Sequence, residues 1–489
     1  MSTTVVQTNY GHVRGEQVGD VSVWKGIPYA KALRFRPPQK PDVWEGVYEA
    51  RQFGASAMQP QSEVMDFLGA AIKEEEMSEA CHYVNIWSPA ANGRKRPVMV
   101  WIHGGAFLNG AGSSPSYDGA SFAANHDVVV VTFNYRLGVF GFLHLGGVDN
   151  EQFAGSGNCG LLDQIAALEW VRENIEAFGG DPHNITIFGE SAGAMSVGIL
   201  LTLSSAKPLF QKAILQSGAG RNVLSPVVAE QVCKGILANL EIGVDELAKL
   251  EHLSAAELLE ASKYVPPMML GPVLDGVVIH ETPEVSVAKG VCRDIAILIG
   301  TNKDEYNLYS IFDSSLDQLD EQGIRQRLEH LLPDKWTNIV SHLHNRSFNR
   351  ELVEKMMTFD IFTAPAIRLA EEQAKQEGPV WVYRFDWETP VLNGGLKSCH
   401  ALEIPFVWNA LGRKAEFLLG SAPNQELADR MHKAWATFAR HGDPNIEELP
   451  IWPAYHVKNR ETMLFDHECT IVNDPDSELR LIWEVVTVS

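Results

Sequence analysis

One serine stands between two glycines in the segment ITIFGESAGAMSV, which spans residues 185–197. The pattern Gly-x-Ser-x-Gly is centred on Ser191 and occurs once in the chain. Where such a serine joins a buried strand to a helix, the sharp turn exposes its hydroxyl as a nucleophile for acyl transfer. The glycines suit this turn, because a Cβ atom at either position would clash with nearby backbone. The alternative is a tight glycine turn with an incidental serine, and the pattern alone leaves both interpretations open.

A second glycine-rich segment could supply hydrogen-bond donors for the same chemistry. HGGAF, residues 103–107, directly follows the apolar run VMVWI. Acyl transfer develops negative charge on the carbonyl oxygen, and each fixed donor contributes roughly 10²–10³ in rate. We expect the backbone N–H groups of Gly104, Gly105 and Ala192 to bind this oxyanion. A plain turn at the end of a strand is the alternative, and His103 is expected to make structural hydrogen bonds rather than to act as a base.

A serine hydroxyl also needs a histidine that accepts its proton and an acid that orients the histidine. With this kind of turn, the three residues follow the chain order serine, acid, histidine. IAILIGTNKDEY places Asp304 and Glu305 just after a predicted strand, and either carboxylate could reach the histidine. His400 follows a still later predicted strand and is the only histidine between that strand and His432. The order of all the parts therefore predicts acyl-transfer chemistry.

Six short apolar runs predict strands that are buried on both faces, as in a parallel sheet covered by helices. They span residues 98–102, 128–133, 185–188, 213–215, 295–299 and 380–385. Between the second and third runs, apolar residues recur at three- and four-residue steps over 161–178, which predicts a helix that ends at Gly179. This alternation of strands and helices predicts a doubly wound α/β fold.

The rest of the chain interrupts or precedes this series of strands. Leu- and Glu-rich stretches at approximately 222–290 and 311–378 predict helical insertions that cover the active site. We expect these insertions to belong to one domain over 1–489 rather than to separate domains. The first 50 residues, with GHVRGE and VSVWKGIPYA, are expected to form a small antiparallel β-meander.

The composition is that of a soluble globular protein, with 489 residues, 45% hydrophobic and 21% charged. The 62 acidic and 40 basic residues give a net charge of −22, which disfavours binding to nucleic acid or to an anionic membrane surface. No apolar stretch approaches the roughly 20 residues of a membrane span, and the first residues lack the pattern of a secretory signal. Six widely spaced cysteines without a Cys-x-x-Cys pair disfavour a zinc site. These features favour a cytoplasmic protein.

Taken together, the motifs resemble those of the type B carboxylesterases of the cholinesterase superfamily, in particular the bacterial p-nitrobenzyl esterases. The resemblance covers almost the whole chain and rests on motifs that follow the family's order. These motifs are WKGIPYA, RPVMVWIHGGAF, NYRLGVFGFL, FGGDPHNITIFGESAG, LQSGA, GPVLDG, LIGTNKDE, HALEIPF and WATFARHGDPN followed by WPAY. The resemblance implies an α/β-hydrolase fold, with a large, mostly parallel central sheet flanked by helices.

The resemblance also implies roles for individual residues. The family's acid is a glutamate at the position of Glu305, and its histidine opens the HALEIPF element at His400. Its nucleophile corresponds to Ser191. Glu190 and Ser217 match residues that lie behind these three in relatives, so they are expected to orient the reacting groups. Ordinary buried hydrogen bonding is the alternative for both.

The implied family roles extend to the oxyanion donors, which correspond to Gly104, Gly105 and Ala192. The expected function is a serine carboxylesterase that converts a small-molecule ester to an alcohol and a carboxylate through an acyl-enzyme, without a metal or an organic cofactor. A monomer or weak homo-oligomer is the expected state. The alternatives are a carbamate or amide hydrolase with the same triad, and a non-catalytic, cholinesterase-like binding module.

The sequence departs from the family pattern in informative places. Met58 stands where relatives often have the cysteine that pairs with the equivalent of Cys81, so we expect the disulfide of secreted relatives to be absent. Near Phe67 there is no counterpart of the tryptophan that relatives use for choline, which gives a choline-ester preference no support. The loop around residues 66–72 is expected to line the acyl and alcohol pockets together with the insertions.

Overall fold

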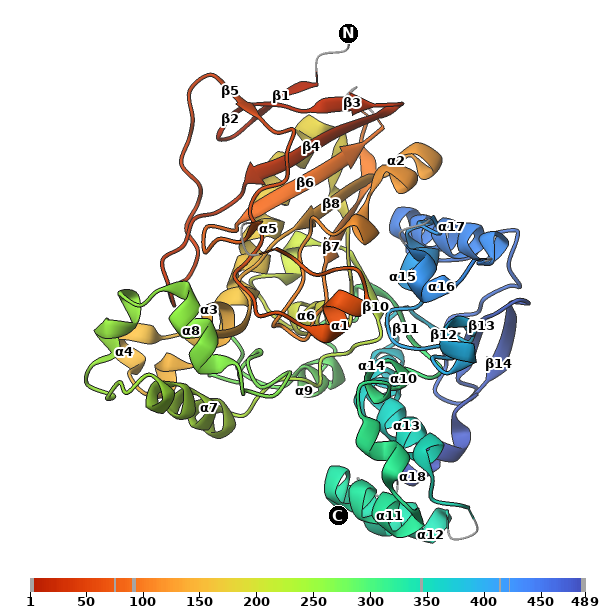
Figure 1. Cartoon of the computed structure of the whole chain (residues 1–489). Coiled ribbons are helices and arrows are strands. Elements are labelled where there is room, and N and C mark those ends of the chain that lie inside the picture. The colour runs from red at the N-terminus through yellow and green to blue at the C-terminus, as the bar shows by residue number, and fades with distance from the viewer. Residues whose placement is uncertain are drawn as a thin grey trace.

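A mixed sheet of eleven strands runs through the computed structural model, which describes residues 4–73, 76–89, 94–343, 346–412, 415–421 and 423–484. The strand order is β14-β13-β12-β11-β10-β9-β7-β8-β6-β4-β3 (Figure 1). The seven central strands pair in parallel: β7 (Arg96–Ile102), β8 (Val129–Phe133), β9 (Gly180–Glu190), β10 (Lys212–Gln216), β11 (Ala296–Asn302), β12 (Val380–Phe385) and β13 (Glu461–Phe465). All six predicted strands are therefore confirmed, and the sheet is mostly parallel.

Antiparallel strands complete the two edges of this sheet. They are β3 (Glu16–Val18), β4 (Val21–Pro28), β6 (Tyr83–Ser88) and β14 (Thr470–Asn473). A separate small sheet contains β1 (Val5–Thr8), β2 (Gly11–Arg14) and β5 (Val47–Glu49).

The predicted antiparallel meander over the first 50 residues is wrong in two respects. The strand β5 pairs with β2 in parallel, and β3 and β4 belong to the large sheet. The reason lies in β4, whose Trp24 and Ile27 are completely buried together with neighbours on both faces. A strand that is buried on both faces must lie between other elements, and an isolated meander cannot provide them.

Helices cover both faces of the large sheet over two apolar cores. On one face lie α3 (Gly138–Phe142), α5 (Cys159–Asn174), α6 (Ala192–Leu200) and α14 (Ala364–Lys375). On the other face lie α2 (Ala120–His126), α15 (Ile404–Val407), α16 (Glu416–Leu419) and α17 (Gln425–His441). The predicted helix over 161–178 corresponds to α5 and a following 3-10 turn, and Gly179 ends it at a φ of 88°. The α/β fold predicted from the sequence is confirmed.

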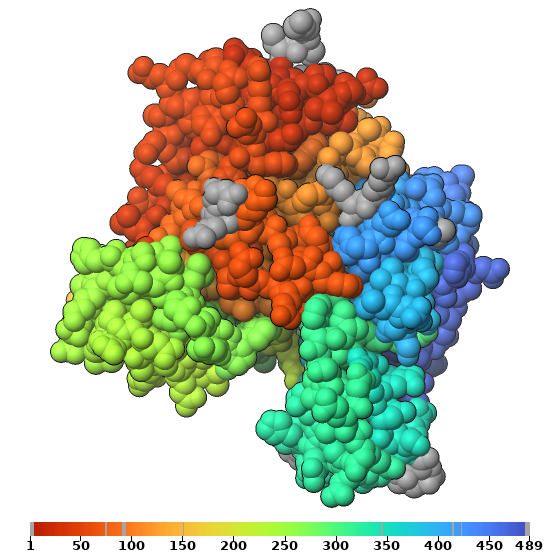
Figure 2. Space-filling view, in the orientation of Figure 1, coloured from red at the N-terminus to blue at the C-terminus, as the bar shows by residue number. Residues whose placement is uncertain are grey.

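Two groups of helices stand out from this body (Figures 1 and 2). The first helical lobe, within residues 222–265, contains α7 (Pro226–Asn239) and α8 (Ala255–Ser262) and packs beside α4 (Asn150–Phe153), whereas α9 (Pro283–Ala288) packs against α14 of the body. The second helical lobe, residues 311–358 with the C-terminal helix, contains α11 (Glu321–Leu331), α12 (Trp336–His342), α13 (Arg350–Thr358) and α18 (Ser477–Glu484) around its own apolar core. The short helices α1 (Glu63–Phe67) and α10 (Asn307–Ser310) lie between the lobes and the sheet.

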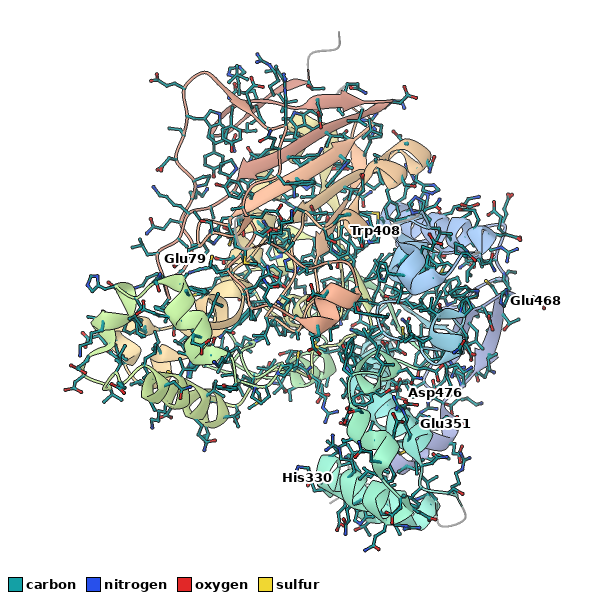
Figure 3. All side chains as sticks on the ribbon, in the orientation of Figure 1. Glu79, His330, Glu351, Trp408, Glu468 and Asp476 are labelled. Carbon is teal, nitrogen blue, oxygen red and sulfur yellow. The ribbon has the colours of Figure 1, made fainter. Side chains whose placement is uncertain are left out.

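Charged contacts attach both lobes to the body. Arg34 pairs with Glu79, which is labelled in Figure 3, and also donates to the carbonyl oxygens of Leu250 and Leu253 in the first lobe. Arg384 of β12 donates to Asp476, also labelled in Figure 3, just before α18. Within the described ranges, no helix has the length and apolar character needed to cross a membrane.

Candidate active site

Ser191 lies at the junction between β9 and α6, in the strand–turn–helix arrangement expected from its sequence. Its φ of 55° and ψ of −126° are unusual for a residue with a Cβ atom, and such strain is typical of functional sites. Its N–H donates to the Gln216 carbonyl at 2.9 Å, and its carbonyl accepts from the Met195 N–H at 2.9 Å. A Cβ atom added at Gly193 would lie 1.9 Å from the carbonyl oxygen of Ile102. Backbone contacts therefore fix the direction of the serine side chain.

The HGGAF loop lies directly beside this turn. Gly105 has a φ of 108°, and a Cβ atom at Gly104 would lie 3.0 Å from the Cβ atom of Ser191. Ala192 is the first residue of α6, so its N–H has no acceptor within the helix. In the described chain, the N–H groups of Gly104, Gly105 and Ala192 donate to no protein atom. Three free donors thus lie near the serine.

His103, the first residue of this loop, makes contacts that stabilise the loop. It is buried, its ring stacks on Tyr135 with centroids 4.4 Å apart, and its Nδ1 lies 2.9 Å from the Gly104 carbonyl oxygen. Because a carbonyl only accepts, Nδ1 carries the proton of this hydrogen bond. Burial lowers the pKa of His103 to about 4, so the ring stays neutral. This contact agrees with the structural role expected for His103.

His400 and Glu305 form a buried pair. Nδ1 of His400 lies 2.6 Å from Oε2 of Glu305, whose other oxygen accepts from the Asn302 N–H at 2.8 Å. Asp304, the other carboxylate that the sequence left open, makes no hydrogen bond to the histidine. Its N–H donates to the Ser398 carbonyl, and burial raises the pKa of its side chain. The geometry therefore selects Glu305 as the partner of His400.

Glu190 faces the opposite nitrogen of the imidazole. Its Oε1 lies 3.0 Å from Nε2 of His400, at ion-pair distance but without the alignment of a hydrogen bond. Burial opposes protonation of His400, yet the neighbouring Tyr309, Glu190 and Glu305 raise its pKa well above the ordinary value. The described contacts of His400 do not include a hydrogen bond to Ser191.

Ser217 lies in the turn after β10, directly after the residue that binds the Ser191 N–H. It is completely buried at a φ of 53°, and its N–H donates to the Gly300 carbonyl at 2.8 Å. Its hydroxyl has no hydrogen-bond partner among the described residues. The structure therefore brings Ser217 close to the nucleophile turn along the chain but gives no contact through which it orients the histidine.

A buried glutamate that sequence reasoning missed lies behind the pair. Glu403 accepts from the Gln216 side chain at 3.0 Å and from the Asn302 side chain at 2.7 Å. The same Asn302 amide donates to the Cys399 carbonyl at 2.7 Å. Burial, together with the nearby Glu190 and Glu305, raises the pKa of Glu403 to about 8. The signal in the sequence that could have identified Glu403 is a glutamate inside the buried, largely apolar segment HALEIPF.

These groups open into a cavity of about 240 Å³. Its floor contains Gly104, Gly105, Glu190, Ser191 and His400. Most of its wall is apolar: Val64, Met65, Leu68, Ala70, Leu308, Ala401, Ile404, Pro405, Phe417 and Leu418. Residues with hydroxyl and amide groups also line it: Ser62, Asn109, Ser114, Ser116, Tyr117 and Tyr309. Apart from Glu190 and His400, no charged side chain of the described chain lines the cavity, which suits an uncharged ligand.

The segment expected to line the pockets does so in part, although it is not simply a loop. Residues 63–67 form α1, and Leu68 and Ala70 after it line the cavity. The ring of Phe67 packs edge-on against Phe312 and Phe417, with centroids 6.0 and 6.2 Å apart. Phenylalanines from three separate segments thus meet near the cavity.

A serine on a strained strand-to-helix turn, with a histidine–carboxylate pair after later strands of a mostly parallel sheet, is the arrangement of an α/β-hydrolase. The sequence model described as the carboxylesterase family matches residues 2–480. The chain belongs to the carboxylesterase family, and it is a carboxylic ester hydrolase whose substrates are small-molecule esters.

Individual relatives agree with this assignment. The chain is 44% identical over 498 residues to the para-nitrobenzyl esterase of Bacillus subtilis, and the match covers 98% of each chain. It is 32% identical over 495 residues to an acetylcholinesterase of Bungarus fasciatus, with 92% of this chain and 80% of the other covered. Among solved structures, a carboxylesterase of Geobacillus stearothermophilus at pH 6.2 superposes with a TM-score of 0.89 and 46% identity, over 98% of this chain and 100% of that one.

Proposed function

We propose that Ser191, His400 and Glu305 are the catalytic triad of this esterase. The observation that supports the proposal most strongly is that His400, paired with Glu305 at 2.6 Å, opens on the same cavity as Ser191. Ser191 attacks the ester carbonyl while Nε2 of His400 takes its proton. Glu305 holds the imidazole with its Nδ1 protonated and stabilises the imidazolium that forms.

The backbone N–H groups of Gly104, Gly105 and Ala192 form the oxyanion hole in this proposal. They hold the negative oxygen of the tetrahedral intermediate, which then collapses as the alcohol leaves with the proton from His400. Water attacks the acyl-enzyme while His400 accepts a proton from this water. His400 then returns the proton to the oxygen of Ser191 as the carboxylic acid leaves. No step uses a metal or an organic cofactor.

Glu190 has a positioning role in the proposal. In the resting enzyme it holds Nε2 of His400 at 3.0 Å, and the turn of the ring toward Ser191 releases this contact. Because the nearby acidic groups raise the pKa of His400, the neutral base becomes more abundant as the pH rises. Ser217 acts only through the backbone, because it directly follows Gln216, the last residue of β10, whose carbonyl accepts from the Ser191 N–H.

We further propose a single domain that works in the cytoplasm as a monomer or weak homo-oligomer. Two large apolar cores that share one sheet support a single domain, to which the second helical lobe adds a smaller core of its own. All six cysteines, Cys81 included, are free, and five of them are buried. Free cysteines are typical of proteins in a reducing compartment. Cell fractionation and sedimentation of the purified protein test location and assembly.

The replacement Ser191→Ala tests the central assignment. It should remove nearly all hydrolysis of a short-chain p-nitrophenyl ester and leave the thermal unfolding temperature close to that of the wild type. Ser204→Ala, at an exposed serine soon after α6, is the matched control and should keep full activity. Retained hydrolysis in Ser191→Ala would exclude this serine as the nucleophile.

A further inference from the structure

A widened helical turn separates α13 from α14. Residues Phe359–Thr363 form a π-helix, and the Ala364 N–H bonds to the Phe359 carbonyl across five residues. The next bond of this kind would join residue 365 to the Asp360 carbonyl. Pro365 has no N–H, so it cannot make that bond. The backbone therefore leaves the Asp360 carbonyl without a helical donor, and π-turns of this kind are frequent at functional sites.

Arg221 supplies the missing donor from a distant part of the chain. Its Nη1 donates to the Asp360 carbonyl oxygen at 2.7 Å and lies 3.4 Å from the Asp360 carboxylate. The same carboxylate accepts from the buried Trp483 indole of α18 at 2.9 Å. We call these three residues the Asp360 clasp. It joins the segment after β10, the π-turn and the C-terminal helix.

The π-turn places one aromatic side chain against the histidine of the active site. The ring of Phe362 lies 4.8 Å from the ring of His400, and Tyr309 stacks on Phe362 at an interplanar angle of 10°. Phe362 is 3% exposed and is not among the residues that line the cavity. It therefore contacts the imidazole rather than the substrate.

The start of the same π-turn also reaches the carboxylate side of the pair. Thr358, the last residue of α13, accepts from the Tyr306 N–H at 3.0 Å through its hydroxyl. Tyr306 directly follows Glu305 in the chain. The segment 358–362 thus contacts the histidine ring at one end and the loop of its carboxylate partner at the other.

We propose that Arg221 and Asp360 are positioning residues, which act through Phe362 to hold the imidazole of His400 in its pairing with Glu305. This inference rests on the proposed function, because it requires His400 to be the base. An ion pair whose arginine side chain is 39% exposed contributes little to folding. A displacement of a catalytic group by about 1 Å, however, can lower the rate about 10²-fold. Loss of the clasp should therefore change turnover more than stability.

The test uses the full-length enzyme and Arg221→Met, which keeps much of the aliphatic stem but removes the guanidinium. We expect kcat for a short-chain p-nitrophenyl ester to fall about tenfold, while KM stays within about twofold because Phe362 does not contact the substrate. Lys375→Met is the control, since it removes an exposed ion pair from α14 without contact to the π-turn. It should match the wild type.

Proton NMR gives a second readout that a general loss of packing would not produce. The proton between Nδ1 of His400 and Glu305 should give a strongly deshielded resonance in the wild type and in Lys375→Met. It should shift or broaden in Arg221→Met. If Arg221→Met fails to fold, Phe362→Leu tests the same contact, with the same expected loss of kcat and change in the resonance.

Unchanged kcat and resonance in the folded Arg221→Met variant, with His400→Gln inactive, would overturn the clasp and leave the proposed triad intact. A change confined to KM would also overturn it. Full activity in His400→Gln would instead refute the proposed function itself. Failure of the Asp360 clasp and failure of the proposed function therefore give different results.

Discussion

The proposed nucleophile and the proposed base are held in different ways. Ser191 is fixed by the backbone of its own turn, by the neighbouring β7 and β10 strands, and by glycines that admit no side chain. His400 lies in a long connection between β12 and α15, and side chains hold it: Glu305 at one nitrogen, Glu190 at the other, and Phe362 on the ring. The serine thus depends on local backbone geometry, and the histidine on contacts between distant segments.

This difference has a consequence for mutations. A side chain added at a glycine of the serine turn should disturb the fold of the turn, because backbone atoms lie where its Cβ atom would be. A change on the histidine side should alter chemistry while the fold survives.

The largest effect is expected for His400→Gln. General base catalysis contributes roughly 10²–10⁴ in rate, and no other described side chain at Ser191 can replace the imidazole, so kcat should fall by about 10⁴. The thermal unfolding temperature should change little. Steady-state kinetics and thermal unfolding of the same preparation check both parts, and a large loss of stability would contradict the contrast.

Glu305→Gln and Asp304→Asn should differ sharply. The first removes the charge that stabilises the imidazolium, and kcat should fall by about 10³ within the range of general base catalysis. The second should leave turnover within a few-fold of the wild type, because Asp304 makes no hydrogen bond to the histidine. If Asp304→Asn lowered kcat more than Glu305→Gln does, the pairing of His400 with Glu305 would not be the one used in catalysis.

Gly193→Ala tests the serine side. Its new methyl group would lie 1.9 Å from the Ile102 carbonyl oxygen, so the turn must move, and kcat should fall about 10²-fold. The free energy of unfolding should fall by about 1–3 kcal/mol. Gly235→Ala, at a helical glycine whose added Cβ atom would meet nothing within 4 Å, should preserve both. Normal stability in Gly193→Ala would show that the turn is less constrained than described.

Glu190→Gln should change the pH dependence of activity. The carboxylate helps to raise the pKa of His400, so its neutralisation should lower that pKa. The neutral base then persists to lower pH, and the acid limb of the kcat/KM profile should move to lower pH. A shift to higher pH, or none, would mean that Glu190 does not interact with the histidine in solution.

The smallest expected effect concerns stability at Glu403. Its pKa is raised from 4.5 to about 8 in the folded state, so the folded enzyme keeps a proton that the unfolded chain releases. Between pH 4.5 and about 8 the free energy of unfolding should therefore fall as the pH rises. Glu403→Gln should weaken this dependence in denaturant titrations across that range. If the free energy of unfolding of Glu403→Gln depended on pH as that of the wild type does, Glu403 would not be protonated in the folded enzyme.

The same contrast explains what could be predicted from the sequence. The nucleophile turn, the HGGAF loop and the strands around them are encoded locally, and the structure has them where they were expected. The residues alone could not choose between Asp304 and Glu305, since both lie in one loop. The pairing of β2 with β5, Glu403 behind the pair and Phe362 on the histidine ring depend on contacts between distant segments, up to 187 residues apart for Glu403 and Gln216. No local pattern specifies such contacts.

The most direct test of Ser191 as the nucleophile is covalent labelling with a fluorophosphonate, followed by mass spectrometry of the peptides. We predict one equivalent of adduct on Ser191, with labelling greatly slowed in His400→Gln and absent in Ser191→Ala. An adduct on another residue, or no adduct on a folded enzyme that hydrolyses the p-nitrophenyl ester, would contradict the central claim that Ser191 is the nucleophile.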